Sequence, residues 1–332
     1  MMNQTVKWIL WAVILAVLAV YPRLFGIYYT NAFVIFAVFA LFAVTFNLLM
    51  GYTGLLSFGH AMYFGAGGYA TALALAHIEG CPLLVALLIG FLASVALALV
   101  ICPIVVRTGG AAFAMLHMAF SQLMYVLALK LRHITGGEDG IGGFPIPPFN
   151  IPGVVSIDME NPLNFYYFAI IVLGVSLWIL WFFTKTPFGQ IMVSVRDNAD
   201  RVDYMGFKVP QSKAVIYTFA GGFAGVAGSI YAMFQDLITA DGALHILNSF
   251  APILITMVGG VGSFFGPICG SAIFAIIDEL TSRYTEQVEL VYGLILILVI
   301  MYAPLGFTGF LQIIRGKWLA RQFKKAMMEG TP

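Results

Sequence analysis

Apolar stretches long enough to cross a lipid bilayer recur along most of this 332-residue chain. A helix needs about 20 mainly apolar residues, within a range of about 17–25, to cross the hydrocarbon core. By this criterion we expect about ten transmembrane helices, of which the first and the eighth are the shortest. They cover residues 8–21, 32–50, 60–78, 82–106, 111–130, 164–184, 213–233, 247–260, 265–282 and 290–308. The sequence therefore predicts an all-α, polytopic integral membrane protein with a single transmembrane domain over residues 1–332.

The composition agrees with the membrane class. Hydrophobic residues make up 61% of the chain and charged residues 9%, where soluble domains have about 45–50% and about 25%. The formal net charge of +1 gives no basic excess for a nucleic-acid partner. Cys81, Cys102 and Cys269 lie within or beside apolar stretches without short spacing, so we expect neither a disulfide framework nor a zinc site.

The start of the chain has two interpretations. Lys7 followed by an apolar run resembles a signal peptide, but no convincing small-residue cleavage site follows it. We therefore expect an uncleaved first helix.

Positive charges gather in two segments, which hold ten of the sixteen Lys and Arg residues. They are 185–213, with Lys185, Arg196, Arg201, Lys208 and Lys213, and the tail 312–332, with Arg315, Lys317, Arg321, Lys324 and Lys325. Because Lys and Arg in short loops mark the cytoplasmic side, we expect both segments, and both termini, to be cytoplasmic. Acidic residues gather in the loops that this topology places outside.

The longest external segment is 131–163, which contains Pro145, Pro147, Pro148 and Pro152. These prolines predict an ordered, non-helical connection. The segment is too short for a domain of its own, so we expect neither a receptor nor an ATPase domain outside the bilayer.

Two glycine-rich segments interrupt the apolar pattern, at 51–60 and at 259–267. Interrupted helices at matching places in two halves point to a transporter's solute path, because they offer free backbone groups. Close helix packing through small residues is the other interpretation, and we weigh the two equally for these breaks. For the glycine runs 65–68 and 221–228 we favour packing.

An amphipathic helix is predicted outside the membrane, over residues 188–206. Its apolar positions are Phe188, Ile191, Met192, Val195, Ala199, Val202 and Met205. Such a helix can dock on a partner protein or lie on lipid headgroups. The mixture of Asp and Arg on its polar face favours the protein partner.

His117 stands alone in the expected fifth span. A polar ring at that depth is expected to face the bundle interior or a water-filled path. It either contacts the solute or hydrogen-bonds to a neighbouring helix.

Catalytic and metal-binding patterns are not found in the sequence. There is no intramembrane metal-ligand cluster, no Ser/His/Asp set and no Gly-x-x-x-x-Gly-Lys-Ser/Thr loop. We therefore expect a transport protein that is not an enzyme, holds no cofactor of its own and takes its driving force from elsewhere.

Five segments stand out in chain order. They are GYTGLLSFGHAMYFGAGGYATAL (51–73), TGGEDGIGG (135–143), TPFGQIMVSVRDNADRVDYMGFKV (186–209), GGVGSFFGPICGS (259–271) and YAPLGFTGFL (302–311). Together they resemble the permeases of branched-chain amino acid ABC importers, in particular the LivM-type subunit, through residues 32–311.

The resemblance implies a subunit of the bacterial inner membrane. Its expected partners are a second, LivH-like permease, two ATP-binding subunits inside, a periplasmic substrate-binding protein outside, and membrane lipid. ATP and Mg would be bound by the partner subunits. The loop that meets the ATPase in this family supplies the candidate coupling residues Arg196, Asp197, Asn198, Arg201 and Gly206.

From the resemblance and the two breaks together, candidate residues of the solute path are Gly54, Ser57, Phe58, Gly59, His60, His117, Gly260 and Gly262. In such permeases a Tyr and a Thr are usual where this chain has Ala112 and His117. Branched-chain or related amino acids are the first expected substrates. Urea or short amides and small or aromatic carboxylates are the alternatives, and an imidazole in the path would suit an anion. The alternative of another class is a stand-alone secondary carrier or channel.

Overall fold

A computed structural model describes residues 4–151, 155–284, 287–302 and 306–309. The tail expected at 312–332 lies outside the described residues. The helices are α1 (Gln4–Thr53), α2 (Ala61–His77), α3 (Leu83–Val105), α4 (Gly110–Lys130), α5 (Arg132–Thr135), α6 (Pro162–Lys185), α7 (Pro187–Asp197), α8 (Ala199–Tyr204), α9 (Val209–Gln235), α10 (Ala240–Ala243), α11 (Ile246–Gly259), α12 (Gly266–Thr281) and α13 (Val288–Tyr302).

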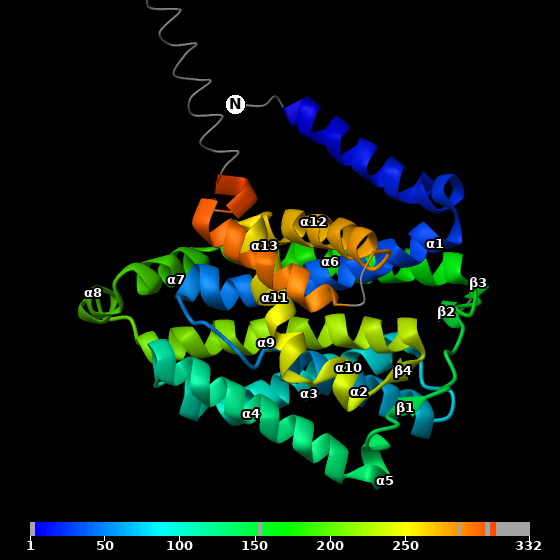
Figure 1. Ribbon diagram of the computed structural model, residues 1–332, viewed down its shortest axis with the longest axis horizontal. Coiled ribbons are helices and arrows are strands. Elements are labelled where there is room, and N and C mark those ends of the chain that lie inside the picture. The colour runs from blue at the N-terminus through cyan, green and yellow to red at the C-terminus, as the bar shows by residue number, and fades with distance from the viewer. Residues whose placement is uncertain (1–3, 152–154, 285–286, 303–305, 310–332) are drawn as a thin grey trace, which may run out of the picture.

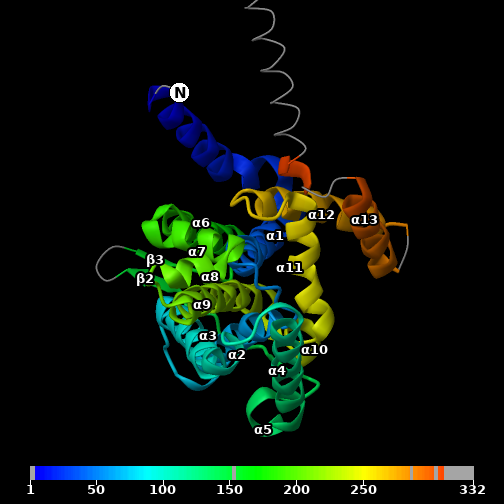
Figure 2. The same cartoon turned by 90° about the vertical axis from the view of Figure 1, so that its left-hand side faces the viewer.

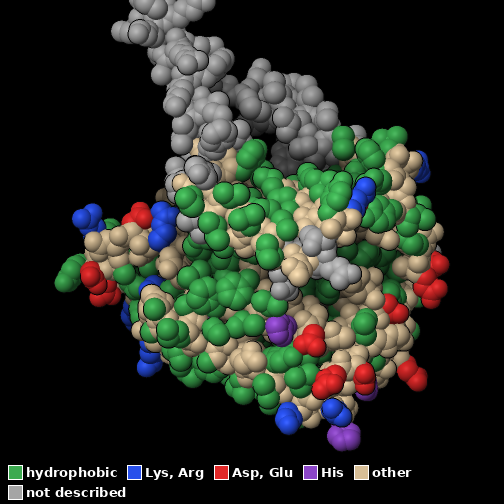
Figure 3. All heavy atoms as spheres, in the orientation of Figure 1, with side chains coloured by type: hydrophobic (Ala, Val, Ile, Leu, Met, Phe, Trp, Pro, Cys, Tyr) green, Lys and Arg blue, Asp and Glu red, His purple; other side chains and the backbone are tan. Residues whose placement is uncertain are grey.

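Six helical segments among the described residues are long and apolar enough to cross a membrane. They are Val17–Thr53, Leu83–Val105, Gly110–Lys130, Pro162–Lys185, Val209–Gln235 and Ala240–Gly259. The chain is thus a helical, multi-pass membrane protein. Hydrophobic side chains are spread over much of the face in Figure 3, and charged ones lie mainly near its edges, as expected for a protein in contact with lipid or an apolar partner.

The first two expected spans form one long helix, α1, with a bend between them. Gly26 has a left-handed φ of 76° and interrupts the helical backbone. Pro22 precedes it by one turn and adds to the interruption, because proline lacks a backbone donor. In Figure 1 the part of α1 before the bend points away from the bundle.

The centre of the bundle consists of α1, α2 and α9, and α3 packs on α2 and α9 with its other face exposed. In Figure 2, α11 to α13 lie on one side of α1, and α6 to α9 lie on the other. Glycines allow α2 and α9 to touch backbone to backbone: a Cβ on Gly67 would lie 2.2 Å from the Gly225 carbonyl oxygen, and one on Gly228 would lie 1.8 Å from that of Phe64. The packing interpretation of both glycine runs is confirmed.

The 131–163 connection contains the short helix α5 and the strands β1 (Ile141–Gly142), β2 (Phe149–Ile151) and β3 (Val155–Ile157). Strand β1 pairs antiparallel with β4 (Leu237–Ile238), so that Ile141 lies opposite Ile238. Strands β2 and β3 pair with Phe149 opposite Ile157. The described part of the connection is ordered and mainly non-helical, as predicted, and it lies at the end of the bundle opposite α7 and α8 (Figure 1).

The single amphipathic helix predicted at 188–206 is wrong in two respects. First, it is two helices, because Asn198 is extended (φ −161°, ψ 99°) and its side chain accepts a hydrogen bond from the Arg201 amide, capping α8. Second, Met192, Val195 and Val202 do not face a partner. They are buried in the chain's own core, because α7, with Met192 and Val195, packs against α1 and α6, and α8, with Val202, packs against α9.

Candidate functional site

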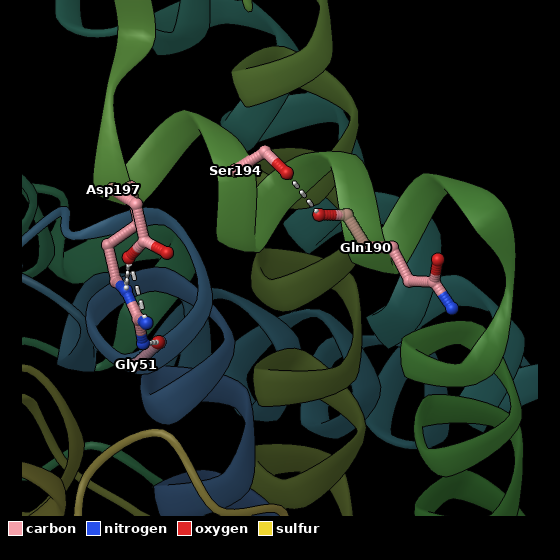
Figure 4. A network of polar contacts seen from close by, with 5 residues as sticks. Gly51, Gln190, Ser194 and Asp197 are labelled. Carbon is pink, nitrogen blue, oxygen red and sulfur yellow. Dashed lines mark hydrogen bonds and ion pairs between the residues drawn. The ribbon is translucent and has the colours of Figure 1, made fainter.

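The side chain of Arg196, in α7, connects the α6–α9 segment to the end of α1. Its Nη1 donates a 2.6 Å hydrogen bond to the carbonyl oxygen of Gly51 (Figure 4). Its Nε and Nη2 donate to Asp197 Oδ1 at 3.1 and 3.0 Å. The carboxylate thereby neutralises and orients the guanidinium, and charge-assisted bonds of this kind are among the stronger ones in proteins.

The amide of Asn47 joins the two glycine breaks, which are about two hundred residues apart in the sequence. Its Nδ2 donates to the carbonyl oxygen of Ser263 at 2.9 Å. Its Oδ1 accepts from the amide of Gly262 at 3.0 Å. The backbones approach closely there, since a Cβ on Gly51 would lie 2.7 Å from the Gly262 nitrogen.

Arg196 also packs over both breaks. Gly54 and Gly262 have left-handed φ angles of 72° and 82°, which side chains with a Cβ rarely adopt. A Cβ on Gly54 would lie 3.2 Å from Arg196 Cγ, and one on Gly262 would lie 3.3 Å from Arg196 Nη1. A movement of α7 would therefore reach both breaks directly. Gly260, the residue after α11, has a φ of 115°.

A second group of predicted path residues lies deeper, in a buried polar cluster. We define the cluster as the rings of His60, Tyr63, His117 and Tyr217, which contact one another, with Ser121, one turn after His117, and Ser57, three residues before His60 in the chain. All six residues are fully or almost fully buried. The phenol of Tyr217 lies 2.8 Å, and that of Tyr63 3.2 Å, from His117 Nε2. The Tyr63 hydroxyl also donates to the Tyr217 hydroxyl.

Four polar atoms of this cluster have no hydrogen-bond partner among the described residues. They are Ser57 Oγ, His60 Nδ1, His117 Nδ1 and Ser121 Oγ. A buried polar atom without a partner costs about 1–3 kcal/mol, and most such atoms in proteins are satisfied. Four in one cluster therefore mark a place where another molecule, solute or water, completes the bonding.

Gly59 allows the segment before α2 to pack closely against α4 at this cluster. A Cβ at Gly59 would lie 2.1 Å from the carbonyl oxygen of His117 and 2.9 Å from the Cβ of Ser121. The ring of Phe58, beside it, contacts that of Phe250, with ring centroids 5.7 Å apart. The structure thus brings His60, His117 and Gly59 together. Gly54 and Gly262 instead lie against Arg196, at what we call the Arg196 junction, and Gly260 lies against Gly266 and Gly306.

The remaining predicted coupling residues lie on the surface of the α7–α8 segment. Asp197 and Arg201 are exposed, and Gly206, with a φ of 89°, ends α8. The large apolar side chains exposed next to it are Tyr204 and Met205, at 90% and 68%, followed by Phe207. We call these three residues the α8 tip. Of the three, only Met205 was predicted from the sequence to be a docking residue.

A large cavity lies toward the other end of the bundle. Its volume is about 1190 Å³, and α1, α6, α9, α11, α12 and α13 contribute to its lining. The lining includes the carboxylates of Glu160, Asp236, Asp278 and Glu279. Two of them accept tyrosine hydroxyls, Glu279 from Tyr28 and Asp278 from Tyr292. None of the predicted path residues lines it.

Residues 28–303 match the protein family described as the branched-chain amino acid transport system permease component. The chain belongs to this permease family. It is 24% identical to the high-affinity branched-chain amino acid transport system permease protein LivM of Escherichia coli K12, over 92% of this chain and 76% of that protein. It is also 24% identical to LivM of Salmonella typhimurium, over 81% of this chain and 67% of that protein.

The permease is similar to LivH-type proteins as well. It is 27% identical to the probable branched-chain amino acid transport permease protein LivH of Methanocaldococcus jannaschii, over 77% of this chain and 84% of that protein. No solved structure matches it. Within the described residues of the permease, no group of three or more His, Cys, Asp and Glu side chains could hold a metal ion.

Sequence reasoning missed the partners of the predicted site residues. Tyr63 and Tyr217 were not recognised as neighbours of His117, and Asn47 was not recognised as the link between the breaks. These contacts join residues 54, 100 and 215 positions apart, so spacing along one helix gives no signal for them. The acidic bias of the expected external loops was the only signal for the carboxylates around the cavity.

Proposed function

We propose that this permease is the membrane-spanning subunit of an ATP-driven importer of a small polar organic solute in the bacterial inner membrane. Branched-chain or related amino acids are the first class to test, because the LivM and LivH relatives are named for them. Urea or amides and small carboxylates are the alternatives within the family. ATP would be bound and hydrolysed by two separate subunits, beside a second, LivH-like permease and a periplasmic binding protein.

The topology that accompanies this proposal has about ten spans with both termini in the cytoplasm. The helices α2, α12 and α13 would add to the six longest ones, and the part of α1 before Gly26 would form a span of its own. The α7–α8 segment then faces the ATPase subunits, and strands β1–β4 face outward.

The observation that carries the coupling mechanism is the hydrogen bond from Arg196 to Gly51. When ATP binding closes the ATPase pair, the α7–α8 segment moves with it. Because Arg196 packs over Gly54 and Gly262, that movement reorients both breaks and shifts the bundle between outward-open and inward-open states. The chain contributes conformational gating, not chemistry.

The docking contact with the ATPase comes from the α8 tip. Tyr204, Met205 and Phe207 are exposed there, next to the charges of Asp197 and Arg201. Exposed aromatic anchors that insert into a pocket supply much of the energy of a protein interface. The buried apolar residues of α7 instead transmit the movement into the bundle.

The cavity at the strand end would receive the solute. It lies near the outward end of the proposed topology, between α1, α6 and α9 on one side and α11 to α13 on the other. The solute would pass from there to the buried polar cluster.

A pulldown tests the proposal. The tagged permease is purified from its native membrane in mild detergent, and everything that comes with it is identified and assayed for ATPase activity. We expect a second permease and an ATPase pair, and we expect both to be lost or reduced when Arg196 and Asp197 are reversed in charge together. A lone chain that moves solute in vesicles without ATP would replace this proposal with the secondary-carrier alternative.

A further inference from the structure

The hydrogen bonds around His117 determine its tautomer. A phenol has one hydrogen to donate. Tyr63 donates its hydrogen to the Tyr217 oxygen, and the Tyr217 hydroxyl has only His117 Nε2 left to receive its own. His117 Nε2 is thus an acceptor, and the ring carries its proton on Nδ1. That Nδ1–H is a buried donor without a partner among the described residues.

The hydrogen bonds around His60 give the opposite tautomer to that of His117. Thr45 donates its single hydroxyl hydrogen to the carbonyl oxygen of Phe42 at 2.7 Å. Its Oγ1 must therefore accept from His60 Nε2, which is 3.0 Å away. The proton of His60 is then on Nε2, and its Nδ1 is a buried acceptor without a partner among the described residues.

The two rings belong to one chain of aromatic contacts. The ring of Tyr63 lies between them, with its centroid 5.9 Å from that of His60 and 5.8 Å from that of His117. The free hydroxyls of Ser57 and Ser121 can each donate or accept. The cluster therefore offers one fixed donor, one fixed acceptor and two adaptable groups.

The cluster residues have no charged hydrogen-bond partner among the described residues. No hydrogen bond or ion pair of the six cluster residues, within the described chain, involves a carboxylate, an ammonium or a guanidinium. An anion that entered would meet no counter-charge, and the desolvation of an unpaired ion at this depth is costly. A group with its own donor and acceptor would instead match, in kind, the acceptor at His60 Nδ1 and the donor at His117 Nδ1.

We propose that this cluster contacts the solute during passage and selects solutes that carry a donor and an acceptor but no net charge, with His117 as the specificity-determining residue. This rests on the proposed transport function. Two chemistries fit it: a zwitterionic amino acid, whose carboxylate accepts from His117 and whose ammonium donates to His60, and a primary amide, whose carbonyl and NH2 groups do the same. A carboxylate anion, which the imidazole alone suggested, does not fit.

The test is solid-state NMR of the permease with its co-purified partners, ¹⁵N-labelled at histidine, in lipid bilayers. The chain has five histidines, and His117→Asn and His60→Asn variants assign the two signals. We expect His117 protonated on Nδ1 and His60 on Nε2. Valine and isobutyramide, added separately, should shift both Nδ1 signals. The anion 3-methyl-2-oxobutanoate, which shares valine's carbon skeleton, should not.

Protonation of His117 on Nε2, or equal shifts with the anion, would overturn the proposal. A response to valine alone or to the amide alone identifies which of the two chemistries is used, and no response to either refutes a solute contact. ATP-driven uptake, measured on the same preparation, distinguishes a failure of the proposed transport function from a failure of the proposed solute contact. Opposite tautomers with solute-induced shifts but no ATP-driven uptake would refute the proposed function, and only the contact between the solute and the cluster would stand.

Transport by variants gives a second, independent readout. His117→Asn keeps an N–H group near the position of Nδ1, whereas His117→Leu removes it. We expect His117→Leu to reduce valine uptake about tenfold and His117→Asn to retain most of it, with both complexes keeping their ATPase activity. Equal loss in both variants would contradict a donor role for Nδ1.

Discussion

Arg196 Nη1 lies 2.6 Å from the carbonyl oxygen of Gly51, so the segment between α6 and α9 is fastened to the last turn of α1. Gly51 and Gly262 are in turn in close backbone contact. One guanidinium therefore links the exposed α7–α8 segment to both breaks in the helical bundle. The proposed coupling between ATP hydrolysis and transport depends on this link.

Removal of that guanidinium should separate ATP hydrolysis from transport. We expect Arg196→Ala to reduce ATP-driven uptake about tenfold or more, because a hydrogen bond to a charged group contributes about 1.5–3 kcal/mol, while the complex still hydrolyses ATP. Uptake and ATPase activity are measured on the same liposomes. Arg107→Ala, at an exposed arginine between α3 and α4, is the control. Equal effects of the two substitutions would contradict the link.

Binding of the ATPase subunits should depend on the α8 tip. We expect Tyr204→Ala to lower the amount of ATPase that co-purifies, since a buried aromatic anchor contributes about 2 kcal/mol or more near the centre of an interface. The matched control is Tyr284→Ala. Tyr284 is 88% exposed, against 90% for Tyr204, but follows α12 instead of α8. Quantitative mass spectrometry of the pulldown gives the ratio of subunits, and an unchanged ratio for Tyr204→Ala would exclude the tip as a docking site.

Stability should depend on the glycine contacts between α2 and α9. We expect Gly228→Ala to lower the free energy of unfolding by about 1–3 kcal/mol, because the new Cβ would lie 1.8 Å from the Phe64 carbonyl oxygen. Gly174→Ala in α6 is the control. No atom lies within 4 Å of its added Cβ, so it should be neutral or slightly stabilising, given the higher helix propensity of alanine. Thermal unfolding in detergent measures both, and a Gly228→Ala protein as stable as the Gly174→Ala protein would be inconsistent with the packing.

The Tyr217 hydroxyl should stabilise the buried cluster. We expect Tyr217→Phe to cost about 1–3 kcal/mol, because it leaves His117 Nε2 without its donor. Tyr231→Phe removes the same group from the same helix and should cost less than about 1 kcal/mol, because no hydrogen bond joins the Tyr231 hydroxyl to another of the described residues. Chemical unfolding curves compare the two, and similar midpoints would mean that the Tyr217 bond is not formed.

Local patterns predicted much of the architecture. Apolar length identified the helices, prolines identified the non-helical 131–163 connection, and glycines located the breaks at 51–60 and 259–267. The break at Asn198 was missed because Asn is tolerated inside a helix, and only its extended backbone and the cap on the Arg201 amide show that α8 starts anew. Helical spacing also could not tell which apolar face of α7 is buried, since a core face and a docking face have the same period.

The sequence predicted individual residues of the site but not the contacts between them. His117 could be recognised as a buried polar ring from its isolation in an apolar helix, but its tautomer depends on Tyr63 and Tyr217, which come from two other helices. Likewise, Arg196 was predicted to be a coupling residue through the family resemblance, whereas its bond to Gly51 spans 145 positions. Such long-range contacts require the folded structure.

ATP-dependent uptake of radiolabelled valine, by liposomes that contain the complex purified through this chain, tests both the transport function and its coupling. With ATP and the binding protein supplied on the appropriate sides, we predict uptake that requires hydrolysable ATP and is lost in the Arg196→Ala complex. Uptake by the permease alone without ATP, or unchanged uptake by the Arg196→Ala complex, would contradict an ATP-driven importer gated through the Arg196 junction.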